Sequence, residues 1–302
     1  MSLLIACLSE ANAKEIAFTF DDSPRFATGF FDGPTRAQKL IDELYQHDLS
    51  GVVFFSNPSS AGKPMNEEGK ARLNAYSKAG HIIANHTYAH GNINELNIEE
   101  YLQGIKLADT ALKQYPTFKK WFRFPYLREG NTLEKRDAVR QYLKELGYIN
   151  GYVTADTYDW YMEVLFQKAI KEAAKSGTQI DMDKLRKFYV NTLVDNIEFA
   201  DKRAQHYLGR SPKHVLLLHE TDLSALFVGD LADAIRKKGW KIISTEEAYT
   251  DDIANFEMQA VYPWNPGRIG EIALESGKKP LDRPASLTEK GLEILFTEMV
   301  LE

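Results

Sequence analysis

Residues 15–24 read EIAFTFDDSP and place a predicted strand directly before two adjacent carboxylates. The first six residues are mostly apolar, β-branched or aromatic, as in a parallel strand that is covered on both faces. Asp21 and Asp22 follow, and Ser23-Pro24 supply turn chemistry, so the same letters also fit an ordinary turn or helix cap. A strand with charged side chains at its C-terminal end is typical of α/β proteins, which carry their chemistry on that edge.

Predicted strands alternate with predicted helices along the rest of the chain. Further strands are predicted at 51–55, 81–84, 121–124, 151–153, 215–218 and 241–243, with helical patterns at 35–47, 67–78, 98–115, 133–146 and 225–238 between them. Strands that alternate with helices through right-handed crossovers close into a barrel or spread into a doubly wound sheet. The length of 302 residues allows one large barrel or two ordinary domains.

Two regions break this rhythm. Two helical stretches without a strand between them predict a helical insertion at about 161–213, between the fifth and sixth strands. After residue 253, the segment YPWNPG at 262–267 predicts a loop, and a closing helix is expected at 287–300. We therefore expect a single catalytic domain over 14–302, with a loop-plus-helix extension at about 254–302.

Composition limits the function classes. Hydrophobic residues make up 44% and charged residues 26%, which favours an ordered globule, and no segment has the ~18 apolar residues of a membrane-spanning helix. The net charge of -6, with both signs interspersed, argues against a nucleic-acid partner. The single cysteine, Cys7, excludes an intrachain disulfide and a cysteine-based zinc site, so a metal would need histidines and carboxylates.

The first 13 residues, MSLLIACLSEANA, combine a short apolar run with a small-x-small sequence at Ala11-Asn12-Ala13. This pattern predicts the remnant of a signal peptide and an exported protein, periplasmic or extracellular. A lipoprotein cleavage site at Leu4-Ile5-Ala6-Cys7 and an ordinary N-terminus are the alternatives.

Polar motifs follow five of the predicted strands. They are DDSP at 21–24, HTYAH at 86–90, RFPY at 123–126, DTYDW at 156–160 and LLLH at 216–219. Each motif alone is weak evidence for a catalytic site; two histidines spaced by three residues, for example, are commonly structural. Together they place two imidazoles and a carboxylate at one edge of the sheet, a facial ligand set that leaves open positions for water and substrate.

In order and in position, the five segments resemble the motifs of the polysaccharide deacetylase family (carbohydrate esterase family 4, the NodB-homology domain), which run TFDDGP, H[ST]xxH, RxPY, DxxDW and LxLH. The resemblance covers about residues 15–248 and leaves the insertion and the extension unexplained. It implies an α/β fold, a distorted (β/α) barrel usually with fewer than eight strands, in agreement with the seven predicted here.

The resemblance also implies roles for individual residues. Asp22, His86 and His90 would bind a divalent metal, most often zinc, with cobalt, nickel or manganese as alternatives. The metal would acidify a water molecule, and Asp21 would take the proton while Arg123 orients it.

On the leaving-group side, the resemblance implies that His219 protonates the departing sugar amine. A carboxylate is needed to keep this imidazole charged. Asp156 is the preferred candidate for that role and Asp159 is the alternative.

Three further residues would contact the substrate. The backbone N–H of Tyr126 would stabilise the oxyanion, and Trp160 and Leu217 would line a pocket for the acetyl methyl group. The chain departs from the family at two positions, with Ser23 and Leu127 where glycine is usual. The second change is expected to alter the rim of the substrate groove.

These features predict a metal-dependent hydrolase that removes N-acetyl groups from an acetylated glycan, of the peptidoglycan or chitin type, and releases acetate. An esterase or amidase acting on O-acetylated xylan or on a small cyclic amide is the first alternative. The second is a glycan-binding protein without turnover. The sequence does not choose the glycan or the oligomeric state.

Overall fold

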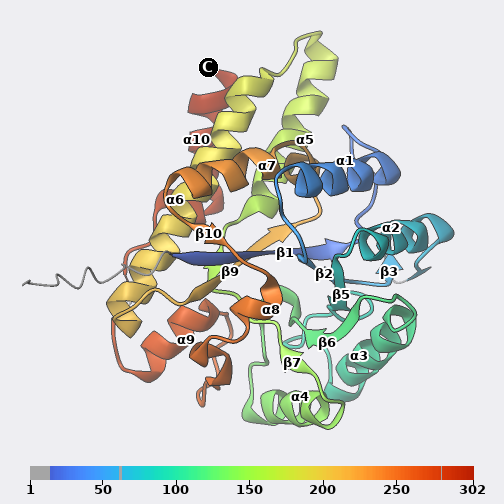
Figure 1. Ribbon diagram of the computed structural model, residues 1–302, viewed down its shortest axis with the longest axis vertical. Coiled ribbons are helices and arrows are strands. Elements are labelled where there is room, and N and C mark those ends of the chain that lie inside the picture. Colours follow the sequence, from blue (N-terminus) through green and yellow to red (C-terminus); the bar gives the residue numbers. More distant parts are fainter. Residues whose placement is uncertain (1–13, 61–62, 280) are drawn as a thin grey trace, which may run out of the picture.

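The computed structural model describes residues 14–60, 63–279 and 281–302, so the predicted signal-peptide remnant at 1–13 lies outside the described residues. Strand β1 (Glu15–Ser23) lies at the centre of the main sheet (Figure 1). It pairs in parallel with β2 (Val53–Ser56) on one side and with β9 (Lys213–His219) on the other. The short β10 (Lys241–Ile242) pairs with the first two residues of β1.

The complete sheet runs in the order β7-β6-β5-β2-β1-β9-β8, with β10 added beside β1, and every pairing is parallel. The bounds of the outer strands are β5 (Ile82–Asn85), β6 (Phe118–Phe122), β7 (Ile149–Asn150) and β8 (Ala155–Asp156). The expected distorted (β/α) barrel is confirmed. The helices cover the outside of this curled sheet, and its strands end on a common edge.

The predicted strand at 151–153 is wrong. These residues cross between β7 and β8, which lie at opposite ends of the sheet order. The N–H of Gly151 donates to Phe122 O at 2.7 Å, and the N–H of Thr154 donates to Val215 O at 3.1 Å. One short segment therefore bonds to β6 at its start and to β9 at its end, which brings the two sheet edges together and leaves no continuous strand between.

The surrounding helices begin where the sequence supplies capping side chains. They are α1 (Gly33–Gln46), α2 (Glu67–Lys78), α3 (Ile98–Leu112), α4 (Leu133–Glu145), α7 (Asp222–Lys237) and α8 (Thr245–Ala248). At the start of α3, for example, Asn97 and Glu100 form a reciprocal capping box. None of the helices in the described ranges combines the length and apolar character that crossing a membrane requires.

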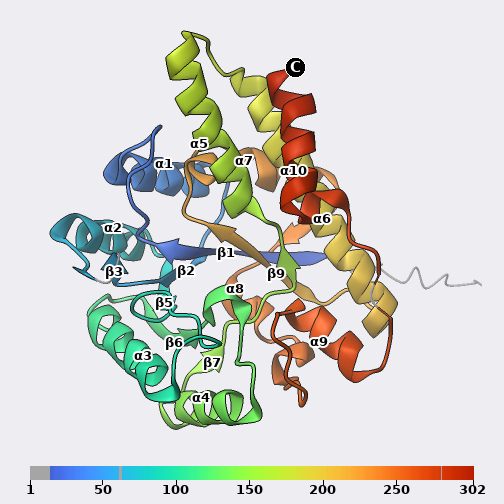
Figure 2. The same ribbon diagram turned by 180° about the vertical axis from the view of Figure 1, so that it is seen from behind.

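The two helices predicted in the insertion are present as α5 (Asp159–Ser176) and α6 (Met182–Leu208). They pack against the last helix, α10 (Glu289–Phe296), and the three stand side by side in both views (Figures 1 and 2). Tyr161 of α5 donates to Glu293 of α10 at 2.5 Å, and the rings of Phe188 and Phe296 lie 5.2 Å apart. The predicted extension therefore packs on the predicted insertion.

The remaining elements are short. The predicted extension also holds α9 (Gly267–Glu275), two 3-10 turns, η2 (Asp252–Asn255) and η3 (Ala285–Leu287), and a final π turn, η4 (Thr297–Leu301). A further 3-10 turn, η1 (Pro125–Leu127), follows β6. Strands β3 (Ser59–Ser60) and β4 (Lys63–Pro64) form a small antiparallel pair near the C-terminal edge of the barrel.

Candidate metal and catalytic site

Asp22, His86 and His90 converge at the C-terminal edge of the sheet. One ligand atom from each lies within 4.8 Å of the other two. The Nε2 atom of His90 is 3.3 Å from Asp22 Oδ1, and the Nε2 atom of His86 is 3.7 Å from the same oxygen. The structure thus brings together the three residues that the sequence nominated as metal ligands.

The backbone around these residues is unusual. Asp22, Thr87 and His90 have φ values of 65°, 63° and 54°, in the left-handed region that non-glycine residues seldom adopt. The side-chain amide of Asn57 donates to Thr87 O at 3.0 Å and also to the backbone oxygen of His86. These bonds hold the strained turn that aims both imidazoles at Asp22.

The residues fit a divalent metal. Asp22 Oδ1 is buried and has no hydrogen-bond partner in the described part of the chain, which is costly for a carboxylate oxygen unless a cation meets it. The Nδ1 atom of His86 lies 2.7 Å from Arg123 O, so Nδ1 carries the proton and Nε2 presents its lone pair. Burial lowers the pKa of His86 and of His90 to about 4, which keeps both imidazoles neutral as ligands require.

Asp21 lies beside this triad and is buried. Its Oδ1 atom accepts a hydrogen bond from Arg123 Nη1 at 2.6 Å, and its Oδ2 atom is 3.7 Å from His86 Nε2. Arg123 is fixed in turn, since its Nε donates to Gly151 O at 2.7 Å and its guanidinium lies 3.9 Å from the centre of the Phe55 ring. Burial raises the pKa of Asp21, while the charge of Arg123 opposes that rise.

His219 pairs with Asp159, and the preferred pairing with Asp156 is wrong. The Nδ1 atom of His219 is 2.7 Å from Asp159 Oδ1, and its backbone N–H donates to Asp159 Oδ2 at 2.7 Å. Asp159 is the first residue of α5 and is fully buried, whereas Asp156 ends β8, opposite Leu217 of β9, and is exposed. The left-handed Tyr158, with a φ of 57°, turns the chain between them and directs the later carboxylate inward.

This pairing controls the charge of His219. Burial alone would lower the pKa of the imidazole, but Asp159, with a further contribution from Asp22, raises it to about 9. The Nε2 atom of His219 lies 4.0 Å from Asp22 Oδ2, so it faces the candidate metal site. Asp159 therefore favours the protonated imidazole at neutral pH.

The three predicted substrate residues have different surroundings. Tyr126 is 53% exposed, and its ring lies 4.5 Å from that of His90. Leu217 is buried within β9, and Trp160 is half-buried beside Tyr158 at a ring distance of 5.8 Å. Only Tyr126 therefore combines exposure with contact to a candidate metal ligand, and the acetyl-pocket role of the other two stays a prediction.

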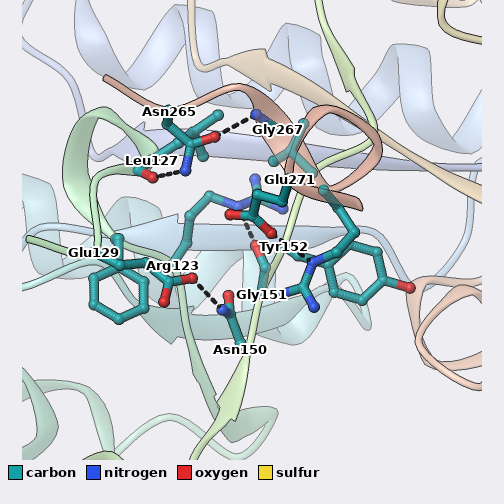
Figure 3. A pocket seen from close by; sticks show the side chains of 12 residues that line it. Arg123, Leu127, Glu129, Asn150, Gly151, Tyr152, Asn265, Gly267 and Glu271 are labelled. Carbon is teal, nitrogen blue, oxygen red and sulfur yellow. Dashed lines mark hydrogen bonds and ion pairs between the residues drawn. The ribbon is translucent and has the colours of Figure 1, made fainter. Parts of the chain in front are cut away.

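Asn265 of the C-terminal extension supports the RFPY loop, a contact that the sequence did not indicate. Its amide donates to Leu127 O, and its Oδ1 accepts the backbone N–H of Gly267 (Figure 3). Leu127 and Tyr126 have φ values of 56° and 57°, which explains why glycine is favourable at position 127 in the family. Asn265 thus holds the strained turn that carries the Tyr126 N–H.

The chain is similar to known polysaccharide deacetylases. The sequence profile of the family described as "Polysaccharide deacetylase" matches residues 9–151. A peptidoglycan-N-acetylglucosamine deacetylase from Bacillus cereus is 27% identical over 150 residues, which cover 49% of this chain and 47% of that protein. A chitin deacetylase from Colletotrichum lindemuthianum is 28% identical over 244 residues, which cover 80% and 82%. The matched region therefore spans about half of the bacterial relative.

Solved structures show the same fold. The chitin deacetylase from Colletotrichum lindemuthianum superposes with a TM-score of 0.55 at 17% identity, covering 84% of this chain and 95% of that one. A family 4 carbohydrate esterase from Streptomyces lividans, solved in complex with acetate, gives a TM-score of 0.51 at 19% identity and covers 78% and 95%. At these identities the likeness establishes the architecture and not the substrate.

Proposed function

We propose that this chain is a metal-dependent hydrolase of the polysaccharide deacetylase family, and that it removes N-acetyl groups from a glycan of the chitin or peptidoglycan type. One observation carries the proposal. A ligand set of Asp22, His86 and His90 lies beside both a buried carboxylate, Asp21, and an imidazole, His219. Amide hydrolysis needs this combination of a base, an acid and an electrophilic centre.

Asp22, His86 and His90 would hold the metal, which when bound would polarise the acetyl carbonyl and acidify a water molecule. Asp21 would take a proton from the water molecule whose oxygen attacks the carbonyl carbon. Arg123 keeps the Asp21 carboxylate in one orientation through the 2.6 Å bond. Water adds across the C–N bond, so the products are acetate and a free sugar amine.

His219 supplies the second proton. Its pKa of about 9 keeps the imidazolium form at neutral pH, and Asp159 keeps Nδ1 occupied so that Nε2 faces the leaving nitrogen. The backbone N–H of Tyr126 is the proposed donor to the oxyanion, and the left-handed turn held by Asn265 sets its direction.

The test is acetate release measured side by side on chitin oligomers, peptidoglycan and acetylxylan. The proposal expects release from at least one N-acetylated glycan and its loss in Asp21→Asn. Release from acetylxylan alone would replace it with the esterase alternative. No release from any glycan or ester, by protein that carries metal, would favour a glycan-binding protein without turnover.

The location follows from the same proposal. Peptidoglycan and chitin are cell-wall polymers, so an enzyme acting on either is expected to be exported, as residues 1–13 also suggest. Immunodetection of the chain in cell fractions tests this. Recovery of the mature protein only from the cytosolic fraction would contradict it.

A further inference from the structure

A cavity of about 250 Å³ opens directly beside the candidate metal ligands. Asp22 and His90 line one side of it, and Phe26 and Ser59 line another. A second cavity of about 240 Å³ shares Phe26 and Ser59 with the first and continues toward the start of α2 at Asn66. Because the two cavities have walls in common, they form one groove that leads away from the reacting centre. Their combined size falls in the range of ~300–1,000 Å³ that is typical of small-ligand sites.

The chemistry of the shared wall suits a carbohydrate. Phe26 is 61% exposed and lines both cavities, so it contributes apolar surface to the groove. The Oγ atom of Ser59 is buried and has no hydrogen-bond partner among the described residues. A sugar ring offers an apolar face to an aromatic ring and hydroxyl groups to an unpaired serine oxygen, so it satisfies both groups at once.

Buried charged side chains hold the segment that carries Phe26 in place. Glu220, which follows His219, is fully buried and accepts the backbone N–H of Arg25 at 2.8 Å. Arg36 Nη2 donates to Arg25 O at 2.8 Å and to Phe26 O at 2.5 Å, and Arg72 Nη1 donates to Arg25 O at 2.7 Å. Two guanidinium groups and a carboxylate therefore fix the backbone on both sides of the Phe26 Cα.

The far end of the same segment is fixed by Asp222. Its Oδ2 atom accepts the backbone N–H of Phe31 at 3.3 Å and the hydroxyl of Thr28, while its Oδ1 atom accepts Arg36 Nη1 at 3.3 Å. Burying these charged groups costs desolvation energy, but their hydrogen bonds hold the backbone rigidly in one position. A preorganised wall loses little conformational entropy when a ligand binds to it.

We propose that Phe26 is a substrate-binding residue, whose ring stacks on the sugar unit next to the one that is deacetylated, and that Ser59 hydrogen-bonds to that unit. This inference rests on the proposed function. It adds a second sugar site in the groove, so the protein is expected to bind at least two sugar units. Arg36, Arg72, Glu220 and Asp222 are positioning residues for this wall.

The test is calorimetric titration of N-acetylglucosamine monomer and dimer into the metal-loaded Asp21→Asn protein, where turnover does not consume the ligand. In this background we expect Phe26→Ala to raise the Kd for the dimer about tenfold and Phe26→Trp to keep it within about twofold. Phe30→Ala is the matched control. Phe30 lies on the same segment and is 42% exposed, but it contacts Phe166 and lines neither cavity.

A dimer Kd that stays within about twofold in Phe26→Ala, or rises equally in Phe30→Ala, would overturn the inference. Equal affinity of the unsubstituted background for monomer and dimer would also overturn it. Acetate release by the wild-type protein is measured separately. If the dimer binds through Phe26 but no acetate is released, the proposed function fails and the binding site stands.

Discussion

The Nδ1 atom of His219 and the Oδ1 atom of Asp159 lie 2.7 Å apart, and the second oxygen of Asp159 accepts the backbone N–H of His219 at the same distance. The carboxylate therefore fixes both the tautomer and the position of the imidazole. Since Asp159 is the first residue of α5, the beginning of that helix sets the orientation of the imidazole.

Replacing Asp159 with asparagine is expected to move the alkaline limb of the pH–rate profile to lower pH. In the proposed mechanism His219 acts in its protonated form, and its pKa of about 9 lies above the ordinary value of 6.5. Activity is therefore expected to be retained below about pH 9 and to fall as the pH rises through that value. Without the Asp159 charge this loss of activity begins at a lower pH, and kcat at neutral pH falls by roughly 10²-fold or more. The measurement is acetate release between pH 6 and 10.

Asp156→Asn is the matched control for this experiment, because it changes the carboxylate that ends β8 and does not contact His219 directly. Its alkaline limb is expected to move less than that of Asp159→Asn. A larger movement for Asp156→Asn would restore the pairing that the sequence favoured.

The motif residues could be predicted because each is set by local sequence. Asp21, Asp22, His86, His90 and His219 all follow strands whose register is fixed by apolar runs. The choice between Asp156 and Asp159 depended on where α5 begins. The left-handed backbone of Tyr158 sets that point, and hydrophobic periodicity does not reveal it.

Other parts of the site could not be predicted because they depend on long-range contacts. Asn265 and Leu127 are 138 positions apart, and Arg25 and Glu220 are 195 apart. Both contacts involve residues outside the five motifs. The strand predicted at 151–153 failed for a similar reason, since it bonds to two strands that are distant in sequence.

Asp21→Asn and Asp22→Asn are expected to separate catalysis from metal binding. Asp21 is held by Arg123, so its amide variant should keep one metal per chain while kcat falls by roughly 10²- to 10⁴-fold. Asp22 presents to both histidines an oxygen that has no hydrogen-bond partner among the described residues, so its amide variant should lose the metal on dialysis. Metal analysis of both variants checks this, and metal loss from Asp21→Asn would mean that the two roles are reversed.

Asn265→Ala is expected to lower kcat about tenfold without changing metal content. The substitution removes the link between the extension and Leu127, so the turn that carries the Tyr126 N–H loses a partly buried hydrogen bond worth about 0.5–1.5 kcal/mol. Asn255→Ala is the control, since Asn255 is exposed on η2 of the same extension. Equal kcat values for the wild type and Asn265→Ala would show that the extension does not position the loop.

Glu163 is expected to make stability depend on pH. It is buried in α5, and burial together with Asp222 raises its pKa from 4.5 to about 7. Between these values the folded chain holds a proton that the unfolded chain has released, so the free energy of unfolding falls as the pH rises through this window. Glu163→Gln should remove this contribution, on the order of 1–3 kcal/mol.

Denaturant unfolding at pH 5 and pH 8 measures the effect of Glu163. The stability of Glu163→Gln relative to wild type should be higher at pH 8 than at pH 5. The control is Glu172→Gln, on the exposed face of the same helix, which should show no such difference. A pH-independent difference for Glu163→Gln would contradict the assignment.

Asp22, His86 and His90 are proposed to form the metal centre of a glycan deacetylase. The most direct test is titration of zinc into chelator-treated wild-type protein, with acetate release from a chitin tetramer recorded at each step. Release is expected to rise from near zero and to saturate at one zinc per chain. Acetate release that survives chelation and does not respond to added metal would contradict it.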